Sequence, residues 1–179
     1  AVRTSRMSEY AEAVKRQRDV FLHLEKNSIP IPRTKFTSTI GEWLVMDQLL
    51  SRGYSPTLKS GQNDVDILLN GGEGIEVKSA TWDSGLGGVY RFDRIKPDKL
   101  AYLICVKLTD DYSESEYFVF TREEVEELPP RNQSAFNDPD RDDNQRLVRV
   151  LDHPETNRGD MRDLNDRLDE FRNAWDKIP

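Results

Sequence analysis

Residues 64–79 have the sequence DVDILLNGGEGIEVKS, in which two alternating segments flank a pair of glycines. The alternating hydrophobic residues are Val65, Ile67 and Leu69 in the first segment and Ile75 and Val77 in the second. A period of two is typical of β-strands that bury one face. The run Asn70-Gly71-Gly72 favours a tight turn between them. The stretch therefore predicts a β-hairpin with strands over 64–69 and 74–79.

The charged residues of this hairpin form a pattern that indicates a catalytic, metal-binding site. Side chains two apart in a strand point the same way, so Glu76 and Lys78 share a face. If Ile67 and Ile75 face the core, Asp66 can converge with Glu76 on the other face. Two carboxylates offer the oxygen ligands that Mg²⁺ prefers. A lysine beside them can orient a water or neutralise charge developing on a phosphate.

A helix is expected over residues 39–52, because its apolar residues have helical spacing and Gly53 follows as a stop signal. This helix carries Glu42, for which two interpretations stand. Thr39 and Glu42 have the spacing of an N-terminal capping box. Alternatively, Glu42 joins the carboxylates of the hairpin. An amphipathic helix over residues 8–26 precedes it, and two prolines at 30 and 32 separate the two helices.

The rest of the chain predicts further strands and two more helices. The run Ala101–Leu108 is almost entirely apolar, which is typical of a buried central strand. Other strands are expected at Val89–Phe92, Tyr117–Phe120 and Arg146–Leu151, with a short one within Tyr54–Leu58. A helix capped by Thr121 and Glu124 is expected up to Leu128, and a final helix is expected over Asp160–Trp175.

The order of these elements resembles the core of the PD-(D/E)xK nuclease superfamily, which includes restriction endonucleases and Holliday-junction resolvases. The resemblance covers residues 38–120, and Asp/Glu-x-Lys occurs only once in the chain, at Glu76-Val77-Lys78. The superfamily's proline before the first aspartate is replaced here by Val65. The resemblance implies an α/β fold, with a restriction-endonuclease-like core and a mixed central sheet flanked by helices.

The same resemblance implies roles for individual residues. Asp66, Glu76 and the carbonyl of Val77 would bind Mg²⁺, for which Mn²⁺ could substitute. Lys78 would serve the nucleophilic water, and Glu42 would be the helix carboxylate of the site. Asp64 remains an alternative to Asp66, because both lie on the same face of the predicted strand.

The implied activity is metal-dependent endonucleolytic hydrolysis of DNA. A restriction-type enzyme is the first expectation, and a structure-specific resolvase or repair nuclease is the second. Cutting both strands with one site per chain would need a homodimer, and a larger restriction or defence complex is a further possibility. The rival classes are a non-catalytic DNA- or partner-binding module of the same fold and an acidic DNA mimic. We expect a helical extension at 1–36, a nuclease core at 37–130 and an acidic C-terminal extension at 131–179, with its final helix packed on the core.

The charge is distributed unevenly along the chain. Residues 1–107 carry 16 Lys/Arg and 13 Asp/Glu, whereas residues 108–179 carry 10 and 20. Phosphate contacts supply much of the affinity of proteins for DNA. Candidates for such contacts are Arg91, Arg94, Lys96 and Lys99, together with Lys35. For any one of these side chains taken alone, ordinary surface charge is the favoured interpretation.

Two observations concern the cellular setting. No apolar run approaches the roughly 18 residues of a membrane span, so we expect no membrane association. The chain has one cysteine, Cys105, which excludes an intrachain disulfide and favours a reducing cytoplasm. Its apolar neighbours predict that Cys105 is a small core residue.

Overall fold

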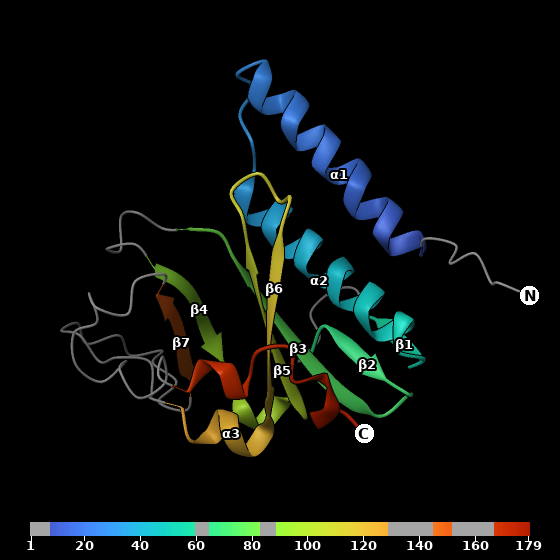
Figure 1. Cartoon of the computed structure of the whole chain (residues 1–179), viewed down its shortest axis with the longest axis vertical. Helices are drawn as coiled ribbons and strands as arrows, with labels where there is room; N and C mark the ends of the chain where they lie inside the picture. The colour runs from blue at the N-terminus through green and yellow to red at the C-terminus, as the bar shows by residue number, and fades with distance from the viewer. Residues whose placement is uncertain (1–7, 60–64, 83–88, 129–144, 152–166) are drawn as a thin grey trace, which may run out of the picture.

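The structure, a computed structural model, describes residues 8–59, 65–82, 89–128, 145–151 and 167–179. Its centre is a five-stranded sheet in the order β1-β2-β3-β5-β6 (Figure 1). The strands of this sheet are β1 (Pro56–Leu58), β2 (Ile67–Leu69), β3 (Glu73–Ala80), β5 (Tyr102–Leu108) and β6 (Ser115–Thr121). β3 and β5 pair in parallel and the other neighbours are antiparallel. This arrangement confirms the expected mixed sheet of an α/β protein.

Three helices and a second sheet complete the described fold. The helices are α1 (Glu9–Lys26), α2 (Arg33–Ser51) and α3 (Arg122–Glu126). The second sheet pairs β4 (Val89–Ile95) with β7 (Arg146–Leu151). Figure 1 shows α1 lying on α2, and α2 lying across the central sheet. Within the described ranges, every helix is too short or too polar to serve as a membrane span.

The β2–β3 hairpin forms as its sequence predicts. Ile67 pairs with Ile75 and Leu69 with Glu73 in an antiparallel ladder. The turn places Asn70 at φ 47° and Gly71 at φ 82°, a backbone region that asparagine and glycine tolerate best. Both isoleucines are fully buried. Burial of the two isoleucines therefore fixes the register of the hairpin, and this register determines the face of β3 on which Glu76 and Lys78 lie.

The core has two parts, one on each side of the central sheet. The first joins α2 to the sheet and contains Ile104 and Val106 of β5. The second joins β4 and β7 to the sheet and contains Leu103 and Cys105 of the same strand. β5 is thus buried on both faces, which explains its nearly continuous apolar sequence. Cys105 is a buried core residue, as predicted.

Helix α2 begins at Arg33, six residues earlier than the periodicity predicted. The added turns place Phe36 and Thr37 in buried positions, and Pro32 precedes the first turn. The polar run before Ile40 hid this extension, because its only large apolar residue is Phe36. Thr39 and Glu42 consequently lie in the helix interior. The capping-box interpretation of Glu42 is wrong.

The C-terminal segment also differs from the prediction. Residues 160–166 of the expected helix lie outside the described residues, as do Asp64, the glycine loop at 85–88 and the polar stretch 132–144. From residue 167 on, the chain forms short 3-10 helices at Leu168–Glu170 and Trp175–Lys177 in place of an α-helix. Between them, the carbonyl of Phe171 accepts from the Val119 N–H at 2.8 Å. Backbone pairing with β6 thus competes successfully with helix formation.

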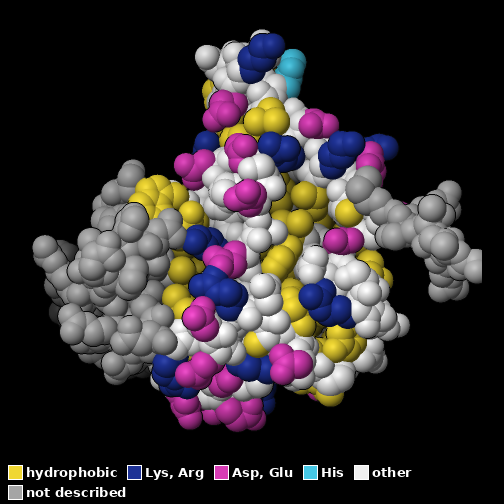
Figure 2. Space-filling model, in the orientation of Figure 1, with side chains coloured by type: hydrophobic (Ala, Val, Ile, Leu, Met, Phe, Trp, Pro, Cys, Tyr) yellow, Lys and Arg dark blue, Asp and Glu magenta, His cyan; other side chains and the backbone are white. Residues whose placement is uncertain are grey.

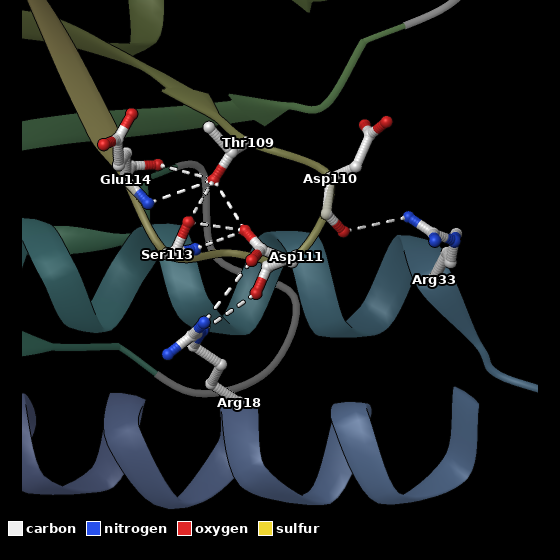
Figure 3. Close-up of polar contacts among 7 residues, drawn as sticks. All are labelled: Arg18, Arg33, Thr109, Asp110, Asp111, Ser113 and Glu114. Carbon is white, nitrogen blue, oxygen red and sulfur yellow. Dashed lines mark hydrogen bonds and ion pairs between the residues drawn. The ribbon is translucent and has the colours of Figure 1, made fainter. Parts of the chain in front are cut away.

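The loop between β5 and β6 is fastened to both long helices (Figure 3). Arg18 of α1 donates to the Asp111 carbonyl at 3.0 Å, and Arg33 of α2 donates to the Asp110 carbonyl at 3.4 Å. Hydrogen bonds from Ser113, then from Thr109, lower the pKa of Asp111 to about 2. These contacts fix α1 and the start of α2 relative to the sheet.

Candidate active site

Asp66 lies at the point where β2 and β3 part. Their ladder ends at the Ile67–Ile75 pair, and the Asp66 N–H donates to the Ile75 carbonyl at 3.1 Å. The Asp66 Oδ2 then accepts from the Val77 N–H at 2.7 Å. A side-chain carboxylate thus takes the place of a backbone partner, and its position is fixed against the next strand.

Glu76 and Lys78 project from the same face of β3, as alternation predicts. Lys78 Nζ lies 2.6 Å from Glu76 Oε1, and the two side chains are 26% and 17% exposed. A half-buried ion pair of this kind is less screened by water than a surface pair. The Lys78 ammonium group therefore supplies the positive charge that balances the Glu76 carboxylate.

Glu42 reaches the same place from helix α2. Burial, together with the negative charges of Asp66 and Glu76, raises the pKa of Glu42 to about 7. Coulomb interactions weaken with distance, so the effect of Asp66 and Glu76 on Glu42 indicates that the three carboxylates are neighbours. The structure therefore brings Glu42, Asp66 and Glu76 together with Lys78, as the sequence pattern predicted.

Gly41 makes this approach possible. A Cβ atom at Gly41 would lie 1.7 Å from Ser79 Oγ, which shows how closely α2 lies on β3. Glu42 is the next residue, so its distance from β3 depends on this contact. The sequence carries a signal for this contact, because a glycine inside a helical pattern indicates close packing, but the periodicity alone does not assign Gly41 a role.

The electrostatics of the cluster favour an added cation or proton. Burial raises the pKa of Asp66, against the opposing effects of the Val77 N–H and of Lys78. Burial also raises the pKa of Glu76, and Lys78 opposes it. Three neighbouring carboxylates thus each have a raised pKa, and Lys78 interacts with two of them, Asp66 and Glu76. Carboxylates crowded in this way accept a proton or bind a cation more readily than isolated ones.

The donor set is compatible with a hard divalent cation. Asp66 and Glu76 supply carboxylate oxygens, and Val77 presents its carbonyl on the same strand edge as its N–H, beside Asp66. Oxygen ligands alone are what Mg²⁺ prefers. In the described part of the chain, no three His, Cys, Asp or Glu side chains already form a ligand group. For a divalent cation to bind, the Glu76 carboxylate would have to release the Lys78 ammonium group and coordinate the cation instead.

The predicted phosphate-contacting residues do not form one cluster. Arg91 of β4 lies near the first turns of α2, where both line one cavity. Arg94 lies farther along β4 with φ 57°, while Lys96 precedes the 3-10 helix Pro97–Lys99 beside α3 and Lys99 ends it. Lys35 is exposed on α2. Their role in DNA binding stays a prediction.

Comparisons with known proteins add a finding about the fold. No protein-family model matches the chain, and no curated protein matches it. The solved structure of a bacterial homing endonuclease, I-Ssp6803I, is similar, with a TM-score of 0.53 and 15% sequence identity. The similarity covers 81% of this chain and 92% of that one. At this identity the likeness concerns the fold.

Proposed function

We propose that this chain is an endonuclease that hydrolyses DNA phosphodiester bonds with Mg²⁺, or Mn²⁺ in its place, at a PD-(D/E)xK-type site. The observation that carries the proposal is the convergence of Glu42, Asp66, Glu76 and Lys78 where β2 and β3 part. The fold's likeness to a homing endonuclease supports it. A non-catalytic binding module would have no need to hold three carboxylates at raised pKa around one lysine.

Each residue of the cluster has a distinct task in this proposal. When bound, a divalent cation supplies charge stabilisation at a phosphoryl oxygen and lowers the pKa of a water molecule. Asp66 and Glu76, with the Val77 carbonyl, would hold the cation, and the Val77 N–H keeps Asp66 oriented for it. Lys78, released from Glu76, orients the attacking water and offsets the negative charge that develops on the phosphate. Glu42 adds a third carboxylate from the side of α2.

The finer proposal is a restriction-type enzyme that cuts both strands of a duplex. One site per chain cuts one strand at a time, so a symmetric homodimer is the simplest assembly. A structure-specific resolvase would use the same four residues on a branched substrate. The substrate preference therefore distinguishes the two activities, whereas the site does not.

Cleavage assays test the proposal. Supercoiled, linear and branched DNA are incubated with the protein in Mg²⁺ and in EDTA, and the same is done with Asp66→Ala and Lys78→Ala. Glu73→Gln is the matched control, because Glu73 is an exposed carboxylate on the same strand. We expect cutting that requires Mg²⁺, disappears in both variants and persists in the control. Cutting that survives Lys78→Ala, or no cutting of any substrate by folded protein, contradicts the proposal.

A further inference from the structure

The cavity lined by Arg91 and the first turns of α2 includes Ser79, the residue that follows Lys78. It has a volume of about 250 Å³ and lies between the first turns of α2, the end of β3 and β4. Its described lining includes Arg33 and Arg91, five serine or threonine residues, and no acidic residue. Figure 1 places the start of α2 at the opposite end of the sheet from α3. Figure 2 shows acidic side chains gathered at that α3 end. The cavity thus lies away from the acidic surface.

Two buried polar atoms at this cavity lack a hydrogen-bond partner among the described residues. They are Ser79 Oγ and Arg91 Nε. A buried polar atom without a partner costs free energy, so it commonly marks a site for a ligand or an ordered water. Arg91 is held in place by Asp93, which accepts from its Nη2 at 2.8 Å. The guanidinium is therefore fixed in position, while its Nε–H has no hydrogen-bond acceptor among the described residues.

The chemistry of the lining selects an anion with several oxygens. Arginine donates in a planar fork that matches phosphate oxygens, and hydroxyl groups commonly contact DNA phosphates. The Thr37 hydroxyl shares a hydrogen bond with Tyr112 Oη at 3.0 Å, and Arg33 donates to the Asp110 carbonyl. The ligand would accordingly be bound mainly by Arg91 and by the remaining hydroxyl residues Thr34, Ser38, Ser79 and Thr81.

We propose that this cavity binds a non-scissile phosphate of the DNA strand whose neighbouring phosphodiester bond is cut at Asp66, Glu76 and Lys78. The inference rests on the proposed nuclease function. Ser79 directly follows Lys78, and Thr81, just past the end of β3, is three positions beyond Lys78. At about 3.3 Å per residue this is about 10 Å, which places the bound phosphate within about three nucleotides of the cut. The cavity is also smaller than the roughly 300–1,000 Å³ of sites for whole small molecules.

DNA binding tests the inference without cleavage. The Lys78→Ala protein binds a labelled duplex in EDTA, and fluorescence anisotropy gives the affinity between 50 and 200 mM KCl. Added Arg91→Gln should weaken binding about tenfold and reduce the salt slope by about 0.9, the value for one phosphate contact. Thr81→Val should weaken binding with no change of slope. The control is Arg16→Gln, since Arg16 on α1 is 78% exposed and pairs with Glu12.

The outcomes separate this inference from the proposed function. Equal slopes for Arg91→Gln and Arg16→Gln, in proteins with unchanged circular dichroism spectra, overturn the inference. Absence of DNA binding by the folded protein also overturns it. Stabilisation by inorganic phosphate that depends on Arg91, with an unaltered DNA slope, would assign the cavity to a free anion and overturn it too. Arg91-dependent DNA binding without cleavage by the protein with intact Lys78 would show that the cavity binds a DNA phosphate, but it would sink the proposed function and overturn the assignment of that phosphate to a cleaved strand.

Discussion

Replacing Glu42 by glutamine should stabilise the metal-free protein, and the gain should depend on pH. Burial and the charges of Asp66 and Glu76 raise the Glu42 pKa from 4.5 to about 7 in the folded protein. The protonated carboxyl is therefore favoured by folding, and stability is lost as pH rises through 7. Glutamine resembles the protonated form at every pH. The two proteins should be equally stable at pH 4.5 and should differ most above pH 7.

The magnitude follows from the size of the shift. One pKa unit corresponds to about 1.4 kcal/mol, and the Glu42 side chain is partly exposed, so the gain should be about 2–3 kcal/mol at pH 8.5. For a chain of this length it should raise Tm by roughly 5–10 °C. Mg²⁺ should reduce the difference in stability between Glu42→Gln and the wild type, because a cation beside the three carboxylates stabilises the ionised wild type selectively.

Urea unfolding and thermal melts at pH 4.5, 7 and 8.5, with EDTA and with Mg²⁺, measure this effect. Glu73→Gln is the control, and it should show no comparable dependence on pH. A Glu42→Gln gain that is the same at pH 4.5 and pH 8.5 would refute the reasoning. It would mean that the Glu42 carboxyl is neither buried nor close to Asp66 and Glu76 in solution.

Three further predictions follow from single contacts. Gly41→Ala should lower stability and cut the cleavage rate at least tenfold, because its Cβ would clash with Ser79; Ser79→Gly in the same chain should restore the stability, and no such rescue would contradict the close approach of α2. Asp66→Asn should keep an acceptor for the Val77 N–H, so urea unfolding should show a change of less than about 1 kcal/mol while cleavage is lost. Phe171→Ala should cost about 3–5 kcal/mol, because this buried ring stacks at 4.3 Å on a ring of β6; a cost below about 1 kcal/mol would show that the C-terminal segment does not pack there.

The hairpin was predictable because its signals are local. Alternation over Ile67–Leu69 and Ile75–Val77, with Asn70 and Gly71 in the turn, defines both the strands and their register. The same register determines which face Glu76 and Lys78 share. The capping box at Thr121 was predictable for the same reason, and it is present in α3.

Features that depend on tertiary contacts were not predictable. Helix α2 begins at Arg33 because Phe36 and Thr37 find buried places in the fold, which the local pattern does not show. The chain around Phe171 does not form the expected α-helix, because its backbone forms hydrogen bonds with β6 instead. The cavity at Arg91 joins three elements that are distant in sequence. The catalytic and metal-binding roles of the site residues stay predictions.

The binding of Mn²⁺ in the absence of DNA tests most directly whether the carboxylates around Lys78 form a divalent-cation site. Electron paramagnetic resonance measures free Mn²⁺ during titration of the wild type, Asp66→Asn and Glu73→Gln, and needs no knowledge of the DNA sequence that is cut. We predict saturable binding to the wild type and to Glu73→Gln, weakened at least tenfold by Asp66→Asn. Equal affinity of the wild type and Asp66→Asn, or no binding to any of the three folded proteins, would contradict the account.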